Sequence, residues 1–366
     1  MSLVARSSPL LGDPLARRSL EVLKAGQARS GAFVASPTFS VYDFAWLRDG
    51  AFCARALDVV DEHLAASAFH QWVATSVEAH RELFESAVHA LGNGETPAPD
   101  AMPPARYTLE GAREHDEDEP WPNFQVDGYG MWLWALEAHL GGRRPEAGLA
   151  RTIALVAGYL TASWPLKCFN CWEEYDGGEH ASTVGAVVAG IESAGRMLGE
   201  QAWAAEADKV RAHLLETFVS DGRFRRGAHD ARLDGSLLWL SVPFGVLPPD
   251  DPRIVATVEG IRRELAGAGG GIYRYRGDTY YGGGQWLLLT SSLAWHQAVA
   301  GNRDESGSSQ AWVRGQALAN GDFPEQACDH PQVAEMVDPW VRRWGSVATP
   351  LLWSHAMYLL AEAAAL

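Results

Sequence analysis

Two acidic stretches far apart in the chain hold the residue types that acid–base chemistry needs. The first, CWEEYDGGEHAST, sets Glu173 and Glu174 beside a tryptophan in a loop ahead of an apolar segment. Neighbouring side chains point in different directions, so one could donate a proton while the other binds a hydroxyl group. A solvated acidic loop is the alternative. The second stretch, GDFPEQACDHPQVAEM, contributes Glu325 and Gln326, with Glu335 as a nearby alternative carboxylate.

Two other segments place planar polar groups next to aromatic rings. VYDFAWLRDGAF holds Tyr42, Trp46, Arg48 and Asp49 ahead of a helix, and EPWPNFQ holds Trp121 in a loop. An adjacent Arg and Asp can bind vicinal hydroxyl groups with a forked donor and an acceptor. A structural ion pair is the alternative for these two side chains.

A glycine-rich segment, GGGIYRYRGDTYYGGGQW, adds Arg274, Asp278 and Trp286. Its glycines are not a phosphate loop, because no Lys-Ser/Thr follows them. Aromatic rings cover the C–H faces of a sugar while polar groups bind its hydroxyls, so these loops together predict a site for a small neutral oligosaccharide. Hydrolysis of a glycosidic bond needs one carboxylic acid and one carboxylate, which Glu173 and Glu325 could supply from facing loops.

The cysteines do not predict a metal site. Cys168 and Cys171 form one Cys-x-x-Cys pair, whereas a structural zinc site usually needs four ligands, often in two such pairs. Cys53 and Cys328 are isolated, and no two histidines have zinc-ligand spacing along the sequence. We therefore expect no metal and no cofactor, and we expect reduced thiols in a cytoplasmic protein. The N-terminal residues lack the apolar run of a signal peptide, and no window reaches the roughly 20 apolar residues of a membrane span.

Composition narrows the possible partners. The 366 residues are 47% hydrophobic and 21% charged, which is typical of a globular protein. The net charge of −16 would repel phosphate groups, so nucleic acids and anionic membranes are poor candidates. A neutral ligand is indifferent to this charge. We expect a monomer or a simple homo-oligomer.

The elements that must position these loops are helices. Apolar residues recur at spacings of three and four, as at Trp203, Ala207, Val210, Leu214 and Phe218. About twelve such segments are predicted, near 14–26, 49–62, 66–90, 128–141, 146–163, 182–198, 201–219, 236–242, 252–265, 284–299, 303–319 and 348–365.

Some of these helices are polar on one face and others are apolar nearly all round. Such an alternation of outer and inner helices predicts an all-α fold, an (α/α)6 barrel, as a single domain over residues 1–366. The long connections 91–125, 164–181, 266–283 and 320–347 carry the polar and aromatic residues, and we expect them to form one shared site at an end of the barrel.

Five motifs, in this order, resemble those of glycoside hydrolase family 15, the glucoamylase-like enzymes. They are YDFAWLRDG, WPNFQVDG, CWEE, RYRGDTYYGGGQW and FPEQ, and the resemblance covers essentially the whole chain. It implies that Glu173 is the general acid, that Glu325 is the general base, and that Glu174 binds substrate near the scissile bond. It also implies an inverting enzyme that releases single glucose units from non-reducing ends.

The same resemblance assigns the remaining residues to substrate binding. Arg48 and Asp49 would bind the terminal glucose. The other residues expected in the pocket are Tyr42, Trp46, Trp121, Arg274, Asp278, Trp286 and Gln326. The compact chain is most similar to the isomaltose glucohydrolase-type members, which favours α-1,6 linkages.

Several alternatives stay open. An α-1,4-specific glucoamylase or a trehalase would use the same residues. A disaccharide phosphorylase shares the barrel but has no use for the base Glu325. A sugar epimerase would rely on paired histidines, for which His180 and His355 are candidates. A non-catalytic helical scaffold would not need sugar-binding residue types concentrated in its loops.

Overall fold

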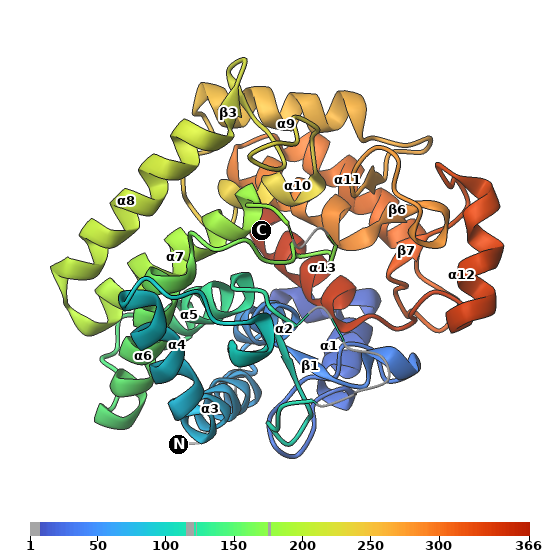
Figure 1. Ribbon diagram of the computed structural model, residues 1–366. Helices are drawn as coiled ribbons and strands as arrows, with labels where there is room; N and C mark the ends of the chain where they lie inside the picture. Colours follow the sequence, from blue (N-terminus) through green and yellow to red (C-terminus); the bar gives the residue numbers. More distant parts are fainter. Residues whose placement is uncertain (1–7, 115–120, 122, 175–176) are drawn as a thin grey trace.

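The computed structural model describes residues 8–114, 121, 123–174 and 177–366. Within them, six helical segments form a closed inner ring in which each contacts the next (Figure 1). In ring order they are α2 (Leu47–Val59), α5 (Asp127–Leu140), α7 (Ala181–Leu198), the 3-10 helix η4 (Gly235–Leu240), α10 (Leu287–Val299) and α13 (Leu352–Ala365).

A second layer of helices packs on the outside of this ring. It comprises α1 (Pro14–Ala25), α3 (His63–Ala79), α4 (Arg81–Gly92), α6 (Ala147–Ser163), α8 (Gln201–Phe218), α9 (Pro252–Glu264) and α11 (Arg303–Gly315). Most of them contact an inner helix directly: α1 contacts α13, α3 contacts α2, α8 contacts α7, and α11 contacts α10. The inner and outer layers together confirm the predicted (α/α)6 barrel.

The two layers follow from the distribution of apolar residues. The outer helix α8 buries only Ala207, Val210, Leu214 and Phe218, the stripe expected of an amphipathic helix. The inner helix α13 buries every residue from 352 to 361, as a helix that is apolar nearly all round must. Close packing of α5 on α7 depends on glycine, because a Cβ atom on Gly130 would lie 2.3 Å from a backbone oxygen of α7.

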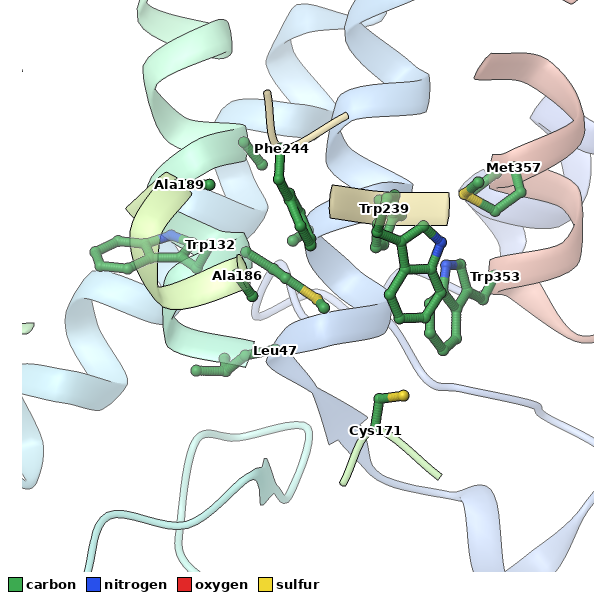
Figure 2. Close-up of a cluster of buried hydrophobic side chains, with 14 of the residues drawn as sticks. Leu47, Trp132, Cys171, Ala186, Ala189, Trp239, Phe244, Trp353 and Met357 are labelled. Carbon is green, nitrogen blue, oxygen red and sulfur yellow. The ribbon is translucent and has the colours of Figure 1, made fainter. Parts of the chain in front are cut away.

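Aromatic side chains fill the axis of the ring. The rings of Trp239 and Trp353 lie 5.6 Å apart (Figure 2). The ring of Phe52 lies 5.5 Å from that of Trp353. Trp172 extends this cluster toward the loops, 5.9 Å from Trp239. The axis of the barrel is therefore packed with aromatic side chains.

The described strands are all two residues long and lie in the loops. They are β1 (Ala45–Trp46), β2 (Arg106–Tyr107), β3 (Val219–Ser220), β4 (Arg223–Phe224), β5 (Ile272–Tyr273), β6 (Gln285–Trp286) and β7 (Gln326–Ala327). β1 pairs with β2, β3 pairs with β4, and β5, β6 and β7 form an antiparallel sheet in that order. Short 3-10 helices also occur in the loops, namely η1 (Pro9–Gly12), η2 (Ser40–Tyr42), η3 (Pro99–Ala101), η5 (Tyr280–Gly282) and η6 (Ala334–Met336).

Four predicted elements differ from the structure. The segment 66–90 is two helices, because α3 ends at Ala79 and α4 begins at Arg81. The segment 236–242 is a 3-10 helix, and the last helix begins at Leu352 rather than at 348. The predicted loop 320–347 contains a helix, α12 (Val337–Trp344). The remaining predicted helices are present within a few residues of their expected bounds.

Parts of three predicted segments lie outside the described residues. They are 1–7 of the N-terminal segment, 115–120 and 122 of the loop 91–125, and 175–176 of the loop 164–181. None of the described helices is long and apolar enough to cross a lipid bilayer.

Candidate active site

A cavity of about 360 Å³ opens at the end of the ring where the inner helices begin. Ten of the twelve site residues predicted from the sequence line it: Tyr42, Trp46, Arg48, Asp49, Trp121, Glu173, Glu174, Arg274, Trp286 and Glu325. The other two, Asp278 and Gln326, lie behind the wall. The predicted loops therefore do meet at one place.

The floor of the cavity includes the first turn of α2, which carries Arg48 and Asp49. Arg48 Nη1 donates to Gln125 Oε1 over 2.7 Å and lies 3.6 Å from Asp127 Oδ2; Asp127 is the first residue of α5, and Gln125 lies two residues before it. Arg48 Nε lies 3.5 Å from Asp49 Oδ2. Gly128 allows this approach, since a Cβ atom there would lie 3.2 Å from the backbone nitrogen of Arg48.

Burial and neighbouring charges shift the pKa values of Arg48 and Asp49 in opposite directions. Burial disfavours the charge of Arg48, but the carboxylates of Asp127 and Asp49 outweigh it and raise its pKa. Burial raises the pKa of Asp49 to about 7, although Arg48 opposes the shift. The pair presents a permanent cation next to a carboxyl group that titrates near neutral pH.

Glu173 sits in a tight turn with a left-handed backbone conformation, at φ +63°. Asn170 closes this turn, because its backbone oxygen accepts from Glu173 N over 2.9 Å and its Oδ1 accepts from Glu174 N over 2.9 Å. A residue other than glycine in this conformation is strained, and such strain is concentrated at functional sites. The turn directs the Glu173 side chain into the cavity.

Two hydrogen bonds fix one oxygen of the Glu173 carboxyl group. Trp46 Nε1 donates to Glu173 Oε1 over 2.5 Å, and Gln125 Nε2 donates to the same atom over 3.0 Å. Trp46 is held in turn by the pairing of β1 with β2. The carboxyl group is thus oriented by two donors from separate elements.

Glu174 turns toward different partners, as the sequence predicts for adjacent side chains. Its Oε2 accepts from the Tyr275 hydroxyl over 2.5 Å, and its Oε1 accepts from Arg274 Nη2 over 3.2 Å. Asp278 is fully buried and binds Arg274 Nε over 2.7 Å and Nη2 over 2.6 Å. Asp278 therefore positions Arg274 and does not line the cavity, whereas the sequence analysis placed it in the pocket.

Glu325 lines the same cavity as Glu173 and lies immediately before β7. Its backbone is fixed by a hydrogen bond from Glu325 N to Ala348 O over 2.9 Å, and β7 pairs with β6, which carries Trp286. Gln326 faces away from the cavity, where its Oε1 accepts from Gly284 N over 2.7 Å and supports the turn before β6.

The Glu325 carboxyl group is buried, with only 3% of the residue exposed. Its Oε1 accepts from the Tyr42 hydroxyl over 3.0 Å, and its Oε2 has no hydrogen-bond partner among the described residues. Burial raises the pKa of Glu325 to about 7, while Tyr42 and Arg274 oppose the shift. Glu335 is exposed and is not among the lining residues, so Glu325 is the carboxyl group of this stretch that faces the cavity.

Tyr42 and Trp46 connect the two carboxyl groups. Their rings lie 5.7 Å apart, with Tyr42 bonded to Glu325 and Trp46 bonded to Glu173. The cavity thus contains two carboxyl groups held separately on either side of one aromatic pair. This is an arrangement suited to a proton donor and a proton acceptor acting on one bond.

Several wall residues were absent from the set predicted from the sequence. They are Phe39, Tyr280, Trp340, Arg343, Trp344 and Trp353. Trp340 and Trp344 lie on α12, four residues apart, so a helical spacing within the predicted loop 320–347 was the signal that could have found them. Trp353 belongs to the aromatic cluster of the axis and closes the inner end of the cavity.

The sequence and the fold have counterparts in known proteins. Residues 15–313 match the family model "Glycosyl hydrolases family 15". The chain is 38% identical over 358 residues to isomaltose glucohydrolase of Kribbella flavida, covering 94% of this chain and 91% of that protein. A solved glycosidase variant in complex with glucose is 36% identical, with a TM-score of 0.90 and 96% of each chain covered. A bacterial glucoamylase complexed with acarbose shares the fold at 20% identity, with a TM-score of 0.75 over 96% of this chain and 55% of that one.

The loops of this helical barrel enclose two carboxyl groups among aromatic side chains, and the family match and the likeness to isomaltose glucohydrolase identify the protein class as glycoside hydrolase. The chain belongs to glycosyl hydrolase family 15.

Proposed function

We propose that the protein is an exo-acting, inverting α-glucosidase that releases β-glucose from the non-reducing ends of short α-glucans. We further propose that it prefers the α-1,6 linkage of isomaltose and isomalto-oligosaccharides. The observation that carries this proposal is one blind cavity that holds both Glu173 and Glu325 beside Arg48 and Asp49. The likeness to an isomaltose glucohydrolase over nearly the whole chain supports the choice of linkage.

In this proposal Glu173 is the general acid and Glu325 the general base. Glu173 gives its proton to the glycosidic oxygen as the bond to the anomeric carbon breaks. Glu325 removes a proton from a water molecule, whose oxygen attacks the anomeric carbon from the opposite face. Because Trp46 and Gln125 both donate to Glu173 Oε1, the proton to be transferred resides on Oε2. Glu325 Oε2, which has no partner among the described residues, is the atom that would accept the proton from water.

The remaining residues would bind the sugar. Arg48 and Asp49 lie at the floor and would bind the hydroxyls of the terminal glucose, and Glu174 would bind substrate near the scissile bond. Trp353 closes the inner end, which supports removal of one glucose at a time. All the proposed proton transfers use side chains of this chain, so the reaction as proposed needs neither a metal nor a cofactor.

The domain organisation, cellular compartment and oligomeric state are also proposals. We infer a single domain over residues 1–366 that works in the cytoplasm, as a monomer or a simple homo-oligomer. The structure has all four cysteines unpaired, which fits a reducing compartment.

A panel of disaccharides tests the substrate assignment. We expect phosphate-free enzyme to hydrolyse isomaltose with a higher kcat/KM than maltose, and maltose faster than α,α-trehalose. Glucose release is measured for each sugar with and without phosphate. Faster hydrolysis of maltose or trehalose would contradict the α-1,6 preference, and an absolute requirement for phosphate would favour a phosphorylase instead.

The pH dependence follows from the buried base. Glu325 must be ionised to accept a proton, and burial raises its pKa to about 7. We therefore expect kcat/KM for isomaltose to rise with pH as Glu325 ionises and to pass through a maximum rather than a plateau, because the proposed reaction also needs the proton on Glu173. Tyr42→Phe removes a hydrogen bond that lowers the pKa of Glu325, so the rising limb should move to higher pH. Tyr273→Phe, whose hydroxyl binds His330 O away from the cavity, is the control and should leave the limb in place. A profile that Tyr42→Phe does not move would contradict this role for Glu325.

The buried pair of Asp278 and Arg274 should affect substrate binding from behind the wall. Asp278→Asn keeps the shape but removes the charge that holds Arg274, so we expect KM for isomaltose to rise about tenfold, equivalent to about 1.4 kcal/mol. Glu305→Gln, which breaks an exposed pair with Arg262, is the matched control and should leave KM unchanged. Equal KM values for both variants would show that Arg274 does not depend on Asp278.

A further inference from the structure

A second cluster of ionisable side chains lies at the end of the ring opposite to the sugar cavity. Asp58 is near the end of α2 and His139 near the end of α5, while His70 comes from the outer helix α3. These three helices pack side by side (Figure 1). Asp58 is nine residues after Asp49 along α2, so the cluster is about 14 Å from the cavity floor along that helix.

The three side chains converge on one point. Asp58, His70 and His139 each offer an oxygen or nitrogen atom, and these three atoms lie within 4.8 Å of one another. His139 Nδ1 is 3.0 Å from Asp58 Oδ1 and 3.2 Å from Oδ2. His63, at the start of α3, also lies against this carboxylate, with its Nδ1 2.9 Å from Asp58 Oδ1.

A hydrogen-bond network alone would explain Asp58, His63 and His139, but it does not explain His70. His70 is only 3% exposed, and neither of its ring nitrogens has a hydrogen-bond partner among the described residues. Its ring lies 4.9 Å from the ring of His139. Buried polar groups in native proteins are nearly always satisfied, so two unsatisfied nitrogens on one ring need a cause.

The chemistry of the three groups suits a borderline metal ion. Imidazole nitrogen and carboxylate oxygen are ligands that zinc and related divalent transition metals accept. Hard ions such as Mg²⁺ and Ca²⁺ prefer oxygen ligands and fit this set poorly.

We propose that Asp58, His70 and His139 form a binding site for a divalent transition-metal ion such as Zn²⁺, separate from the sugar cavity. His63 holds the Asp58 carboxylate from the outer side, and water completes the coordination. Zinc–nitrogen and zinc–oxygen bonds of about 2.0–2.1 Å place neighbouring ligand atoms about 3.4 Å apart. His139 Nδ1 lies 3.0 Å and 3.2 Å from the two Asp58 oxygens, slightly closer than this spacing, so binding requires a small separation of these atoms and an inward shift of the His70 ring.

The position of the site indicates a structural role. The ion ties the ends of two neighbouring inner helices to the outer helix that covers them, and none of its three ligands lines the sugar cavity. The bound ion therefore stabilises the far end of the barrel without taking part in hydrolysis. Binding to the folded state alone raises the melting temperature by mass action.

Metal retention by tag-free protein tests the site. The wild-type protein is stripped with a chelator, incubated with excess ZnCl2, desalted into metal-free buffer and analysed for zinc by mass spectrometry. We expect about one equivalent of zinc, and a melting temperature about 3–5 °C higher in zinc at about 100 times Kd. Co²⁺ in place of zinc should give the visible absorption of a cobalt ion with nitrogen and oxygen ligands.

Three variants separate a specific site from surface binding. His70→Gln and Asp58→Asn should each retain less than about a fifth of the wild-type zinc and lose the melting shift. His296→Gln is the matched control, since His296 is also buried near the end of an inner helix but belongs to no such cluster among the described residues. It should retain zinc fully. If His70→Gln does not fold, zinc retention by Asp58→Asn and by the wild-type protein still tests whether zinc binds at this site.

Two results would overturn the proposal. The first is wild-type protein that retains no stoichiometric zinc and shows no melting shift. The second is zinc retained equally by Asp58→Asn and by wild type. Loss of isomaltose hydrolysis on zinc removal, at temperatures where the protein stays folded, would contradict the structural role.

Discussion

We expect Glu173→Gln to lower kcat for isomaltose by about 10²- to 10⁴-fold, because the leaving sugar can no longer receive a proton as its bond breaks. The glutamine keeps the size and shape of the side chain, so its oxygen can still accept from Trp46 and Gln125. KM should change little. Steady-state kinetics on isomaltose measure both values.

The leaving group identifies the step that Glu173 assists. Fluoride departs without protonation, so Glu173→Gln should hydrolyse α-glucosyl fluoride within about tenfold of the wild-type rate. Glu174→Gln, in the same turn but bonded to Tyr275 and Arg274, is the control and should weaken binding of both substrates alike. If Glu173→Gln lowers the rate of hydrolysis of isomaltose and of α-glucosyl fluoride by the same factor, Glu173 is not the general acid.

The second large effect is expected at Glu325. Glu325→Gln should lower kcat by about 10²- to 10⁴-fold on isomaltose and on α-glucosyl fluoride alike, since activation of water is needed whatever group leaves. Azide needs no deprotonation to attack. Added azide should therefore restore turnover of the fluoride and give β-glucosyl azide, which proton NMR identifies.

Glu335→Gln is the matched control for this variant. Glu335 is ten residues further on, exposed and outside the cavity lining, so its replacement should leave both rates unchanged. An active Glu325→Gln enzyme together with an inactive Glu335→Gln enzyme would reverse the assignment of the base.

Local patterns explain how much of the fold and site could be predicted from the sequence. Helical spacing of apolar residues identifies α8, because a helix buried on one side has apolar residues on that side only. Nearly continuous apolar residues identify inner helices such as α13, because such a helix is buried on all sides. Arg48 with Asp49, and Glu173 with Glu174, stand out because polar groups beside aromatic residues in loops are chemically distinctive.

What the sequence could not predict depends on contacts between distant segments. Asp278 carries the same residue type whether it lines a pocket or holds Arg274 from behind, and only the packing places it behind. Trp340 and Trp344 reach the cavity because α12 forms inside a stretch expected to be a loop. His70 and His139 come from helices far apart in the sequence, so a search for local zinc-ligand spacing could not find them.

The backbone conformation at Glu173 also could not be predicted from the sequence. This left-handed backbone follows from hydrogen bonds made by Asn170, and no residue preference at position 173 predicts it. Burial raises the pKa of two carboxyl groups in the pocket, those of Glu325 and Asp49, to about 7. Burial is a property of the assembled loops and cannot be read from one loop alone.

The stereochemistry of the first product tests the central claim most directly. Fresh enzyme is mixed with isomaltose in phosphate-free buffer, and proton NMR spectra follow the anomeric protons before mutarotation proceeds. An acid at Glu173 and a base at Glu325 acting through water predict that β-glucose appears first. Initial release of α-glucose would mean a retaining reaction and would contradict the paired roles assigned to these two carboxyl groups.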